Sequence, residues 1–356
     1  MLWLTKGVSF YAESLPGGSV DEETKILIIE NLFSTVTNVN FDADWFTDRI
    51  NRTLELRRNL REKYESRAGE VENEELPEAA TWMGNGADSF REKSKKVGVL
   101  SSENEDIRSL RELLTYGIKG IAAYADHAYV LEESEGEIFD FVQKGLAATL
   151  DDDLGADELV SLVLESGDIA VKTMETLDRA NTGTYGDPEP TEVELGVRDN
   201  PAILISGHDL RDMEELLEQT EGEGVDVYTH GEMLPANSYP AFKKYDHFVG
   251  NYGNSWWKQT KEFESFNGPV LMTTNCLVPP KESYRNRVYT TGLVGYPGLD
   301  HVPDREDDQP KDFSEIIDHA KKTDSPEELE SGTIPGGFAH DAILNRAEDI
   351  IEAIKD

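Results

Sequence analysis

The first half of the chain carries apolar residues at helical spacing. In residues 2–12 and again in residues 107–127, apolar side chains recur at i, i+3 and i+4, the pattern of an amphipathic helix. Three acidic residues, Glu103, Glu105 and Asp106, lie at the start of the second stretch, where the helix dipole favours negative charge. Two longer helices are predicted, from residue 42 to about 67 and from 155 to about 181.

The two parts of this helical region are copies of each other. Lys6 of the first copy corresponds to Lys119 of the second, an offset of 113 residues (119 minus 6). The same offset matches residues 6–8 to 119–121, 11–13 to 124–126 and 38–41 to 151–154 without a gap. Matches at this many points indicate a duplication. The sequence therefore predicts a three-helix bundle built twice, the first with its connector in residues 1–98 and the second in residues 99–190.

A different architecture follows residues 182–190, where two glycines and two prolines disfavour a helix. Residues 202–206 (AILIS) have the composition of a buried strand, residues 209–221 that of an amphipathic helix, and residues 225–229 (VDVYT) that of a second strand. This succession is a β-α-β unit, which implies a parallel sheet. Further strands are predicted at 269–274 and 287–294, and a last helix at 340–355. Residues 191–356 are thus predicted to form a Rossmann-like, mostly parallel α/β domain, in a multidomain α and α/β protein.

The charge of the chain excludes one class of partner. Lys and Arg number 34 against 72 Asp and Glu, a formal net charge of −38. So negative a protein is not a nucleic-acid binder driven by phosphate neutralisation, and it is not expected to adhere to an anionic membrane. The acids are spread along the whole chain, which favours a surface adapted to a salt-rich, halophilic cytoplasm. A cytoplasmic location is also predicted because no run of 18 apolar residues exists and Lys6 interrupts the N-terminal apolar stretch.

Three candidate metal ligands stand in equivalent places along the predicted sheet. His208 follows the strand AILIS, Glu232 follows VDVYT, and Cys276 follows the strand at 269–274. Side chains just past the carboxyl ends of parallel strands converge on one crevice, so the three can meet although they are far apart in sequence. Imidazole, carboxylate and thiolate together suit iron or zinc. His230 shares a strand end with Glu232 and is predicted to orient its carboxylate.

Each candidate also has an ordinary structural interpretation. A histidine after a strand is commonly a helix cap or a hydrogen-bonded core residue, although Asp209 is the better cap here. Glu232 is compatible with a simple first-turn helix acid. Cys276 is the single cysteine of the chain, and a lone cysteine is usually a small buried hydrophobe. One cysteine also excludes an intrachain disulfide and an all-cysteine metal site made by these residues alone.

Several local motifs resemble one known family. They are 113–128 (LLTYGIKGIAAYADHA), 181–186 (NTGTYG), 205–210 (ISGHDL), 229–235 (THGEMLP), 249–253 (VGNYG) and 273–276 (TTNC). These motifs closely resemble the hybrid cluster proteins, also called prismane proteins or hydroxylamine reductases, over nearly the whole chain. The resemblance implies a two-bundle helical domain followed by Rossmann-like domains. It also implies an iron-sulfur-oxygen cluster, the hybrid cluster, held by one His, two Glu and four Cys.

The resemblance places His208, Glu232 and Cys276 as three of those seven ligands. The activity it implies is two-electron reduction of hydroxylamine, a small nitrogen-oxide substrate, to ammonia and water. Family members begin with a cysteine motif for a cubane cluster and continue into a further ligand-bearing domain, and neither is found in residues 1–356. We therefore expect no cubane cluster, an incomplete hybrid cluster, and low activity unless a separate chain supplies the missing ligands. The alternatives are a non-catalytic remnant, a partner-dependent subunit and a carbon monoxide dehydrogenase-like protein.

Overall fold

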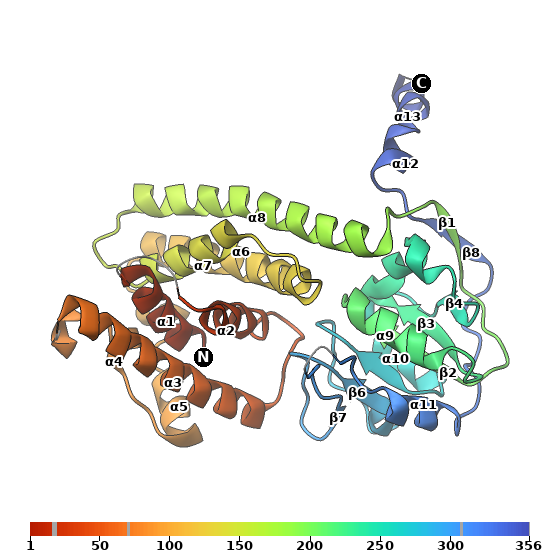
Figure 1. Ribbon diagram of the computed structural model, residues 1–356, viewed down its shortest axis with the longest axis horizontal. Helices are drawn as coiled ribbons and strands as arrows, with labels where there is room; N and C mark the ends of the chain where they lie inside the picture. The colour runs from red at the N-terminus through yellow and green to blue at the C-terminus, as the bar shows by residue number, and fades with distance from the viewer. Residues whose placement is uncertain (16–19, 70–71, 307–308, 356) are drawn as a thin grey trace. The chain divides into compact units, whose positions relative to one another are not determined.

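The computed structural model describes residues 1–15, 20–69, 72–306 and 309–355, shown in Figure 1. The chain forms two compact units. The first, here the helical unit, comprises Met1–Val36 and Asp42–Asp178. The second, here the sheet unit, comprises Thr37–Phe41 and Arg179–Asp356. None of the described helices is long and apolar enough to cross a membrane.

The helical unit contains the order helix, helix, long helix twice. The first trio is α1 (Leu2–Ser14), α2 (Glu22–Phe33) and α3 (Ala43–Ala68); the second is α6 (Glu105–Val130), α7 (Gly136–Ala148) and α8 (Ala156–Tyr185). The long helices start at Ala43 and Ala156, which differ by the 113 residues of the sequence repeat. Side-chain caps begin three of the helices, since Asp21, Asp42 and Asn104 each accept hydrogen bonds from backbone N–H groups of the first turn.

Both trios contribute to one hydrophobic core. Its fully buried members include Val8 of α1, Leu32 of α2, Ile118 of α6 and Leu146 of α7. The predicted boundary at residues 98 and 99 therefore does not coincide with a boundary between compact units, because a helix trio of this size buries its apolar face against its copy. The connector between the trios holds short helices at Asn73–Glu75 (η1), Glu78–Thr81 (α4), Gly86–Ser94 (α5) and Val99–Ser101 (η2).

Helix α8 is longer than its sequence pattern predicts. We expected the helix to stop at residue 182, but it includes Gly183 and ends at Tyr185, followed by Gly186 at φ +85°. The extra turn is stabilised by Tyr185, which is buried and packs its ring against Phe242 at a centroid distance of 4.8 Å. The two prolines, at 188 and 190, lie beyond the end and do not interrupt it.

The sheet unit is built on eight strands in the order β7-β6-β5-β2-β3-β4-β1-β8. The strands are β1 (Thr191–Glu194), β2 (Ala202–Ser206), β3 (Asp226–His230), β4 (Phe248–Asn251), β5 (Val270–Met272), β6 (Val288–Thr290), β7 (Asp300–His301) and β8 (Thr333–Gly336). Every described strand pairing is parallel except that of β1 with β8. The mostly parallel α/β architecture is therefore confirmed.

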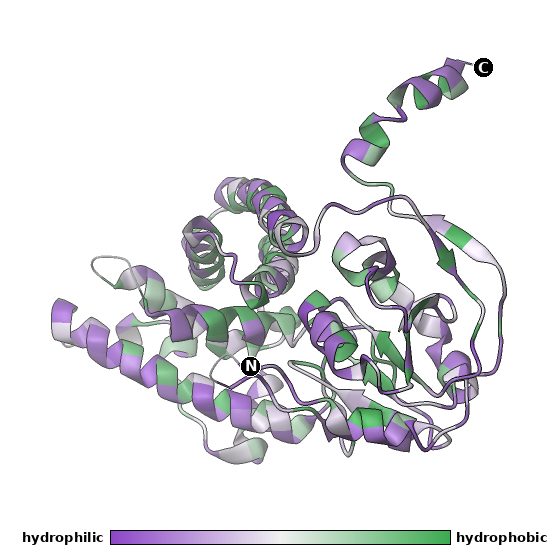
Figure 2. Ribbon diagram, turned by 45° about the vertical axis from the view of Figure 1, so that its right-hand side comes forward, coloured by the Kyte–Doolittle hydropathy of each residue, from purple (hydrophilic) through white to green (hydrophobic). Residues whose placement is uncertain are grey.

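The centre of the sheet is fully buried. All five residues of β2 and all five of β3 are buried, and the central strands are predominantly green in the hydropathy view of Figure 2. The helices of this unit are α9 (Leu210–Thr220), α10 (Gln259–Ser265), α11 (Ser314–Ala320), α12 (Asp341–Leu344) and α13 (Ala347–Lys355), with 3₁₀ turns at Gly231–Ser238 (η3), Pro240–Phe242 (η4), Trp256–Lys258 (η5) and Arg285–Arg287 (η6). The strand pattern with a helix after β2 sets the carboxyl ends of β2, β3 and β5 at one edge.

Two sequence expectations for this unit are wrong in detail. The strand predicted at 287–294 is only the three residues of β6, because the backbone from Thr291 onward turns to bond with Thr37–Phe41: Gly295 N donates to Val39 O and Phe41 N to Gly295 O. The helix predicted at 340–355 is two helices. Arg346 N bonds to Ile343 O, three residues back, which tightens the last turn of α12 and ends it.

Candidate metal centre

Three side chains meet where three neighbouring strands end. His208 lies two residues beyond β2, Glu232 two residues beyond β3, and Cys276 four residues beyond β5. Because β2 pairs with both β3 and β5 in parallel, their carboxyl ends lie side by side. The structure thus brings together the three residues that the sequence singled out.

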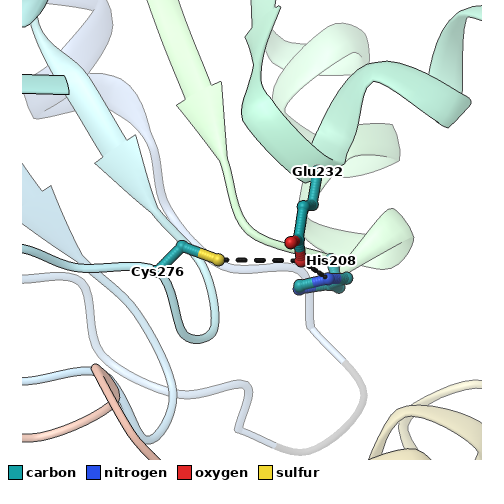
Figure 3. A group of neighbouring side chains, drawn as sticks. All are labelled: His208, Glu232 and Cys276. Atoms are coloured by element: carbon teal, nitrogen blue, oxygen red, sulfur yellow. Dashed lines mark hydrogen bonds and ion pairs between the residues drawn. The ribbon is translucent and has the colours of Figure 1, made fainter. Parts of the chain in front are cut away.

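The ligand atoms of the three residues are close enough to share one metal ion. His208 Nε2 lies 2.6 Å from Glu232 Oε2, and Cys276 Sγ lies 3.7 Å from the same oxygen. The nitrogen, oxygen and sulfur all lie within 4.8 Å of one another, and Figure 3 shows the side chains pointing to a common point. This is the one such group of three or more His, Cys, Asp or Glu found in the part of the chain that the structure describes.

Unusual backbone conformations place these residues. Gly207 has φ +113°, and a Cβ there would lie 2.4 Å from Thr273 Oγ1, so the close approach of the two loops requires glycine. Gly231, at φ +58°, turns the chain after β3. Cys276 itself has φ +74°, a conformation that non-glycine residues rarely adopt and that clusters at functional sites.

The environment of His208 fixes which ring nitrogen faces the other ligands. Nδ1 lies 3.1 Å from the Thr274 hydroxyl, so Nε2 is the nitrogen directed at Glu232. The alternative of a helix-capping histidine does not describe this residue. Asp209 caps α9 instead, its Oδ1 accepting from Arg211 N and Asp212 N at 2.9 Å each.

Cys276 is held as a neutral thiol when no cation is present. Cys276 is 5% exposed. This burial, together with the nearby Glu232 carboxylate, raises the pKa of the thiol to about 12. A metal cation reverses both effects, because it neutralises the carboxylate and binds thiolate. Cys276 is therefore buried, as the ordinary interpretation expected, but its sulfur points at a carboxylate and not into an apolar core.

His230 lies beside the site but bonds elsewhere. It is fully buried, with Nε2 2.9 Å from Glu262 Oε2 and Nδ1 3.3 Å from Ser206 Oγ. Both ring nitrogens thus face partners other than Glu232. His230 therefore links the end of β2 to α10, and its orienting role on the Glu232 carboxylate stays a prediction.

A buried ion cluster anchors helix α9 directly after His208. Asp212, with no exposed surface, lies 2.7 Å from Arg305 Nη2 and 3.0 Å from Lys311 Nζ, and accepts a bond from the Thr291 hydroxyl. Arg305 Nε also lies 2.7 Å from Glu215 Oε1. The two cations lower the pKa of Asp212 against the effect of burial. Sequence reasoning missed this cluster, because its members lie about 80 to 100 residues apart and carry no motif.

A cavity of about 390 Å³ opens beside one ligand. Its walls include Glu232, Asn254, Trp256, Trp257 and Glu330, all of the sheet unit. The Glu232 side chain is 50% exposed, compared with 30% for His208. Of these two ligand side chains, that of Glu232 is the more accessible to small molecules.

Comparisons with known proteins identify the family of this chain. The model of the Prismane/CO dehydrogenase family matches residues 1–356, and the chain belongs to that family. Similar relatives bear the name hydroxylamine reductase. The proteins of Natranaerobius thermophilus, Halothermothrix orenii and Clostridium tetani are 61%, 60% and 54% identical to it over 100% of this chain.

The chain spans only part of these relatives. It covers 65% of the Natranaerobius and Halothermothrix proteins and 66% of the Clostridium tetani protein. Among solved structures, alpha subunits of acetyl-CoA synthase/carbon monoxide dehydrogenase align with 90% of this chain and 44% of that chain, at 15% identity and a TM-score of 0.39. At that score the likeness carries no argument about function.

Proposed function

We propose that this chain belongs to a hydroxylamine reductase and supplies His208, Glu232 and Cys276 as ligands of a hybrid iron-sulfur-oxygen cluster. One observation carries the proposal: three donors of different chemistry, from three strand ends, converge within 4.8 Å. The names of the relatives, at 54 to 61% identity over the whole of this chain, support the assignment.

The donor set fits iron. Thiolate is a soft ligand, imidazole suits iron, and carboxylate accepts a harder, oxygen-preferring position, so the mixture is appropriate for a cluster bridged by both sulfur and oxygen. The charges fit as well. A thiolate at Cys276 beside the carboxylate of Glu232 would repel it, and a bound cation would remove that repulsion around a sulfur that is buried.

The side chains would divide the work by their positions. When bound, the cluster supplies two electrons and a Lewis acid to the reaction of hydroxylamine with two protons, which gives ammonia and water. Cys276 is buried and would anchor the cluster to the interior of the protein. His208 is oriented by Thr274 through Nδ1 and presents Nε2. Glu232, the most exposed of the three and a wall of the cavity, is the ligand that lies nearest to an entering substrate.

Three ligands do not complete a four-iron cluster, in which each iron needs a protein anchor or a bridging atom. The remaining thiolate and carboxylate ligands, and the route for electrons from a donor, therefore come from outside residues 1–356. A further stretch of the same polypeptide and a separate chain would serve equally. A partner-dependent subunit, for which a separate chain supplies those ligands, is the second candidate function. We place the protein in a halophilic cytoplasm because of its charge of −38.

Iron retention tests the proposal. The protein is reconstituted anaerobically with ferrous iron and sulfide, desalted, and assayed for iron and for ammonia release from hydroxylamine. We expect retained iron that falls in His208→Ala and in Cys276→Ser. His319→Ala is the matched control, because that ring bonds Tyr289 away from the site. Equal iron retention in the wild type and the three variants would refute the assignment of the metal site. Rapid turnover of hydroxylamine by residues 1–356 alone would show that no further ligands are needed.

A further inference from the structure

The loop that carries Cys276 is held by one buried amide. Gln259, the first residue of α10 and 1% exposed, donates from Nε2 to Cys276 O at 2.6 Å and to Trp256 O at 2.6 Å. Its Oε1 accepts from Val278 N at 3.0 Å. The Gln259 side chain therefore hydrogen-bonds both the carbonyl of Cys276 and the backbone N–H two residues later.

A second side chain grips the residue between them. Asn38 Nδ2 donates to Leu277 O at 2.7 Å, and Leu277 N donates to Asn38 O at 3.0 Å. Asn38 belongs to the short segment Thr37–Phe41, which is part of the sheet unit although it lies between α2 and α3 in the sequence. Together, Gln259 and Asn38 bond the backbone of three successive residues, Cys276 to Val278.

These bonds act at a strained point. With φ at +74°, Cys276 sits in a conformation that the surrounding structure has to impose. If Cys276 relaxed to a negative φ, its sulfur would leave the position 3.7 Å from Glu232 Oε2. Among the described residues, the amides of Gln259 and Asn38 supply the side-chain hydrogen bonds to this stretch of backbone, and neither is hydrogen-bonded there to a ligand atom of the metal centre.

We propose that Gln259 is a positioning residue of the metal centre, which together with Asn38 clamps the Cys276 loop so that the thiol faces His208 and Glu232. This inference rests on the proposed metal site and explains why the Cys276 thiol faces the other two ligands. Groups that orient a ligand in this way typically alter metal affinity by about 10 to 100-fold.

The chain offers an unusually close control. Gln219 of α9 makes the same pattern elsewhere in the sheet unit, with Nε2 donating to Lys311 O at 2.8 Å and Oε1 accepting from Phe313 N at 2.9 Å. It too bonds a carbonyl and the amide two residues later, but in a loop without a ligand. Gln259→Leu and Gln219→Leu therefore each remove this pair of bonds, and Gln259→Leu also removes the bond to Trp256 O. Only Gln259→Leu should affect the thiol.

Two readouts separate positioning from stability. The first is the reaction rate of the single cysteine with dithiodipyridine in the folded, metal-free protein, which reports access to Cys276 alone. The second is cobalt(II) affinity measured by the thiolate-to-cobalt charge-transfer band. For Gln259→Leu we expect labelling about tenfold faster and cobalt binding at least about tenfold weaker. Gln219→Leu should match wild type in both, whatever its melting temperature.

A second pair of variants keeps the test decisive if Gln259→Leu does not fold. Asn38 and Asn267 both have positive φ, +66° and +65°, and both donate from Nδ2 to a backbone carbonyl, Leu277 O and Ser325 O respectively. Replacement by glycine removes the bond without adding strain. Asn38→Gly should accelerate labelling and weaken cobalt binding, whereas Asn267→Gly should do neither.

The outcomes distinguish the clamp from the metal site. Faster labelling in the Gln259 and Asn38 variants with no cobalt bound by wild type would support the clamp and remove the proposed metal site. Cobalt binding by wild type with labelling and affinity unchanged in both variants would overturn the clamp and leave the site intact. Equal changes in the Gln219 and Asn267 controls would also overturn it, because the effect would then be general destabilisation.

Discussion

Replacing Arg305 by methionine tests whether the buried ion cluster beneath α9 stabilises the sheet unit. The arginine side chain is 16% exposed and lies 2.7 Å from both Asp212 and Glu215, whose side chains are 0% and 8% exposed. Methionine keeps the apolar volume but leaves two buried carboxylates with one cation fewer. Removal of one partner from a buried pair costs about 3–5 kcal/mol. Lys311 still lies 3.0 Å from Asp212, so we expect the lower end, about 3 kcal/mol, or roughly a hundredfold in the unfolding equilibrium.

The assay is urea unfolding at fixed molar salt, with hydrogen exchange to assign the transition to β2 and α9. Arg52→Met is the matched control, because Arg52 pairs with Glu23 at 3.2 Å with side chains 57% and 65% exposed. Such a surface pair contributes about 0–1 kcal/mol and is screened by salt. A loss for Arg305→Met no larger than that of the control, or one that vanishes at high salt, would refute the claim that the buried cluster stabilises this unit.

Three further outcomes are expected. Burial raises the pKa of the Cys276 thiol to about 12, and only the thiolate reacts with dithiodipyridine. The labelling rate of the metal-free protein should therefore rise about tenfold per pH unit up to about pH 11. A rate that levels off near pH 9, as for a free thiol, would contradict the described environment of Cys276. The melting temperature should rise as potassium chloride increases into the molar range, since a net charge of −38 is self-repulsive, and indifference to salt would remove the halophilic interpretation. Gly207→Ala should lower the free energy of unfolding by more than about 2 kcal/mol, because a Cβ would lie 2.4 Å from Thr273 Oγ1. Gly69→Ala is the control: Gly69 also has positive φ but open space around it, so the loss should be only about 1 kcal/mol. Equal losses in the two variants would show that the contact between the loops is unimportant.

Local patterns were sufficient for the elements that have a strong period of their own. The long helix from Ala156 and the buried strands β2 and β3 were predicted because apolar spacing or a buried run marks them without reference to the rest of the chain. The end of α8 was missed because Tyr185 is fixed by a ring contact with Phe242, 57 residues (242 minus 185) further along the chain. The short strands β7 and β8 were missed because two to four exposed residues carry no pattern and become strands only by pairing.

The candidate site divides in the same way. His208, Glu232 and Cys276 could be found because each follows a recognisable strand, and parallel strands bring their carboxyl ends together. The groups that position them could not. Gln259 is 17 residues from Cys276 and Asn38 is 239 residues from Leu277, and a glutamine or asparagine becomes a clamp only when the fold sets it against a particular backbone.

The most direct test of the metal centre is X-ray absorption spectroscopy of the protein loaded with cobalt(II) and no sulfide. Under these conditions Cys276 is the one thiol that can provide a sulfur neighbour. We expect one sulfur at about 2.3 Å and nitrogen or oxygen neighbours at about 2.0–2.2 Å, by analogy with zinc sites. The sulfur shell should disappear in Cys276→Ser, and an imidazole contribution should be lost in His208→Ala. A spectrum with oxygen neighbours only, unchanged by either substitution, would contradict the claim that these residues form one metal centre.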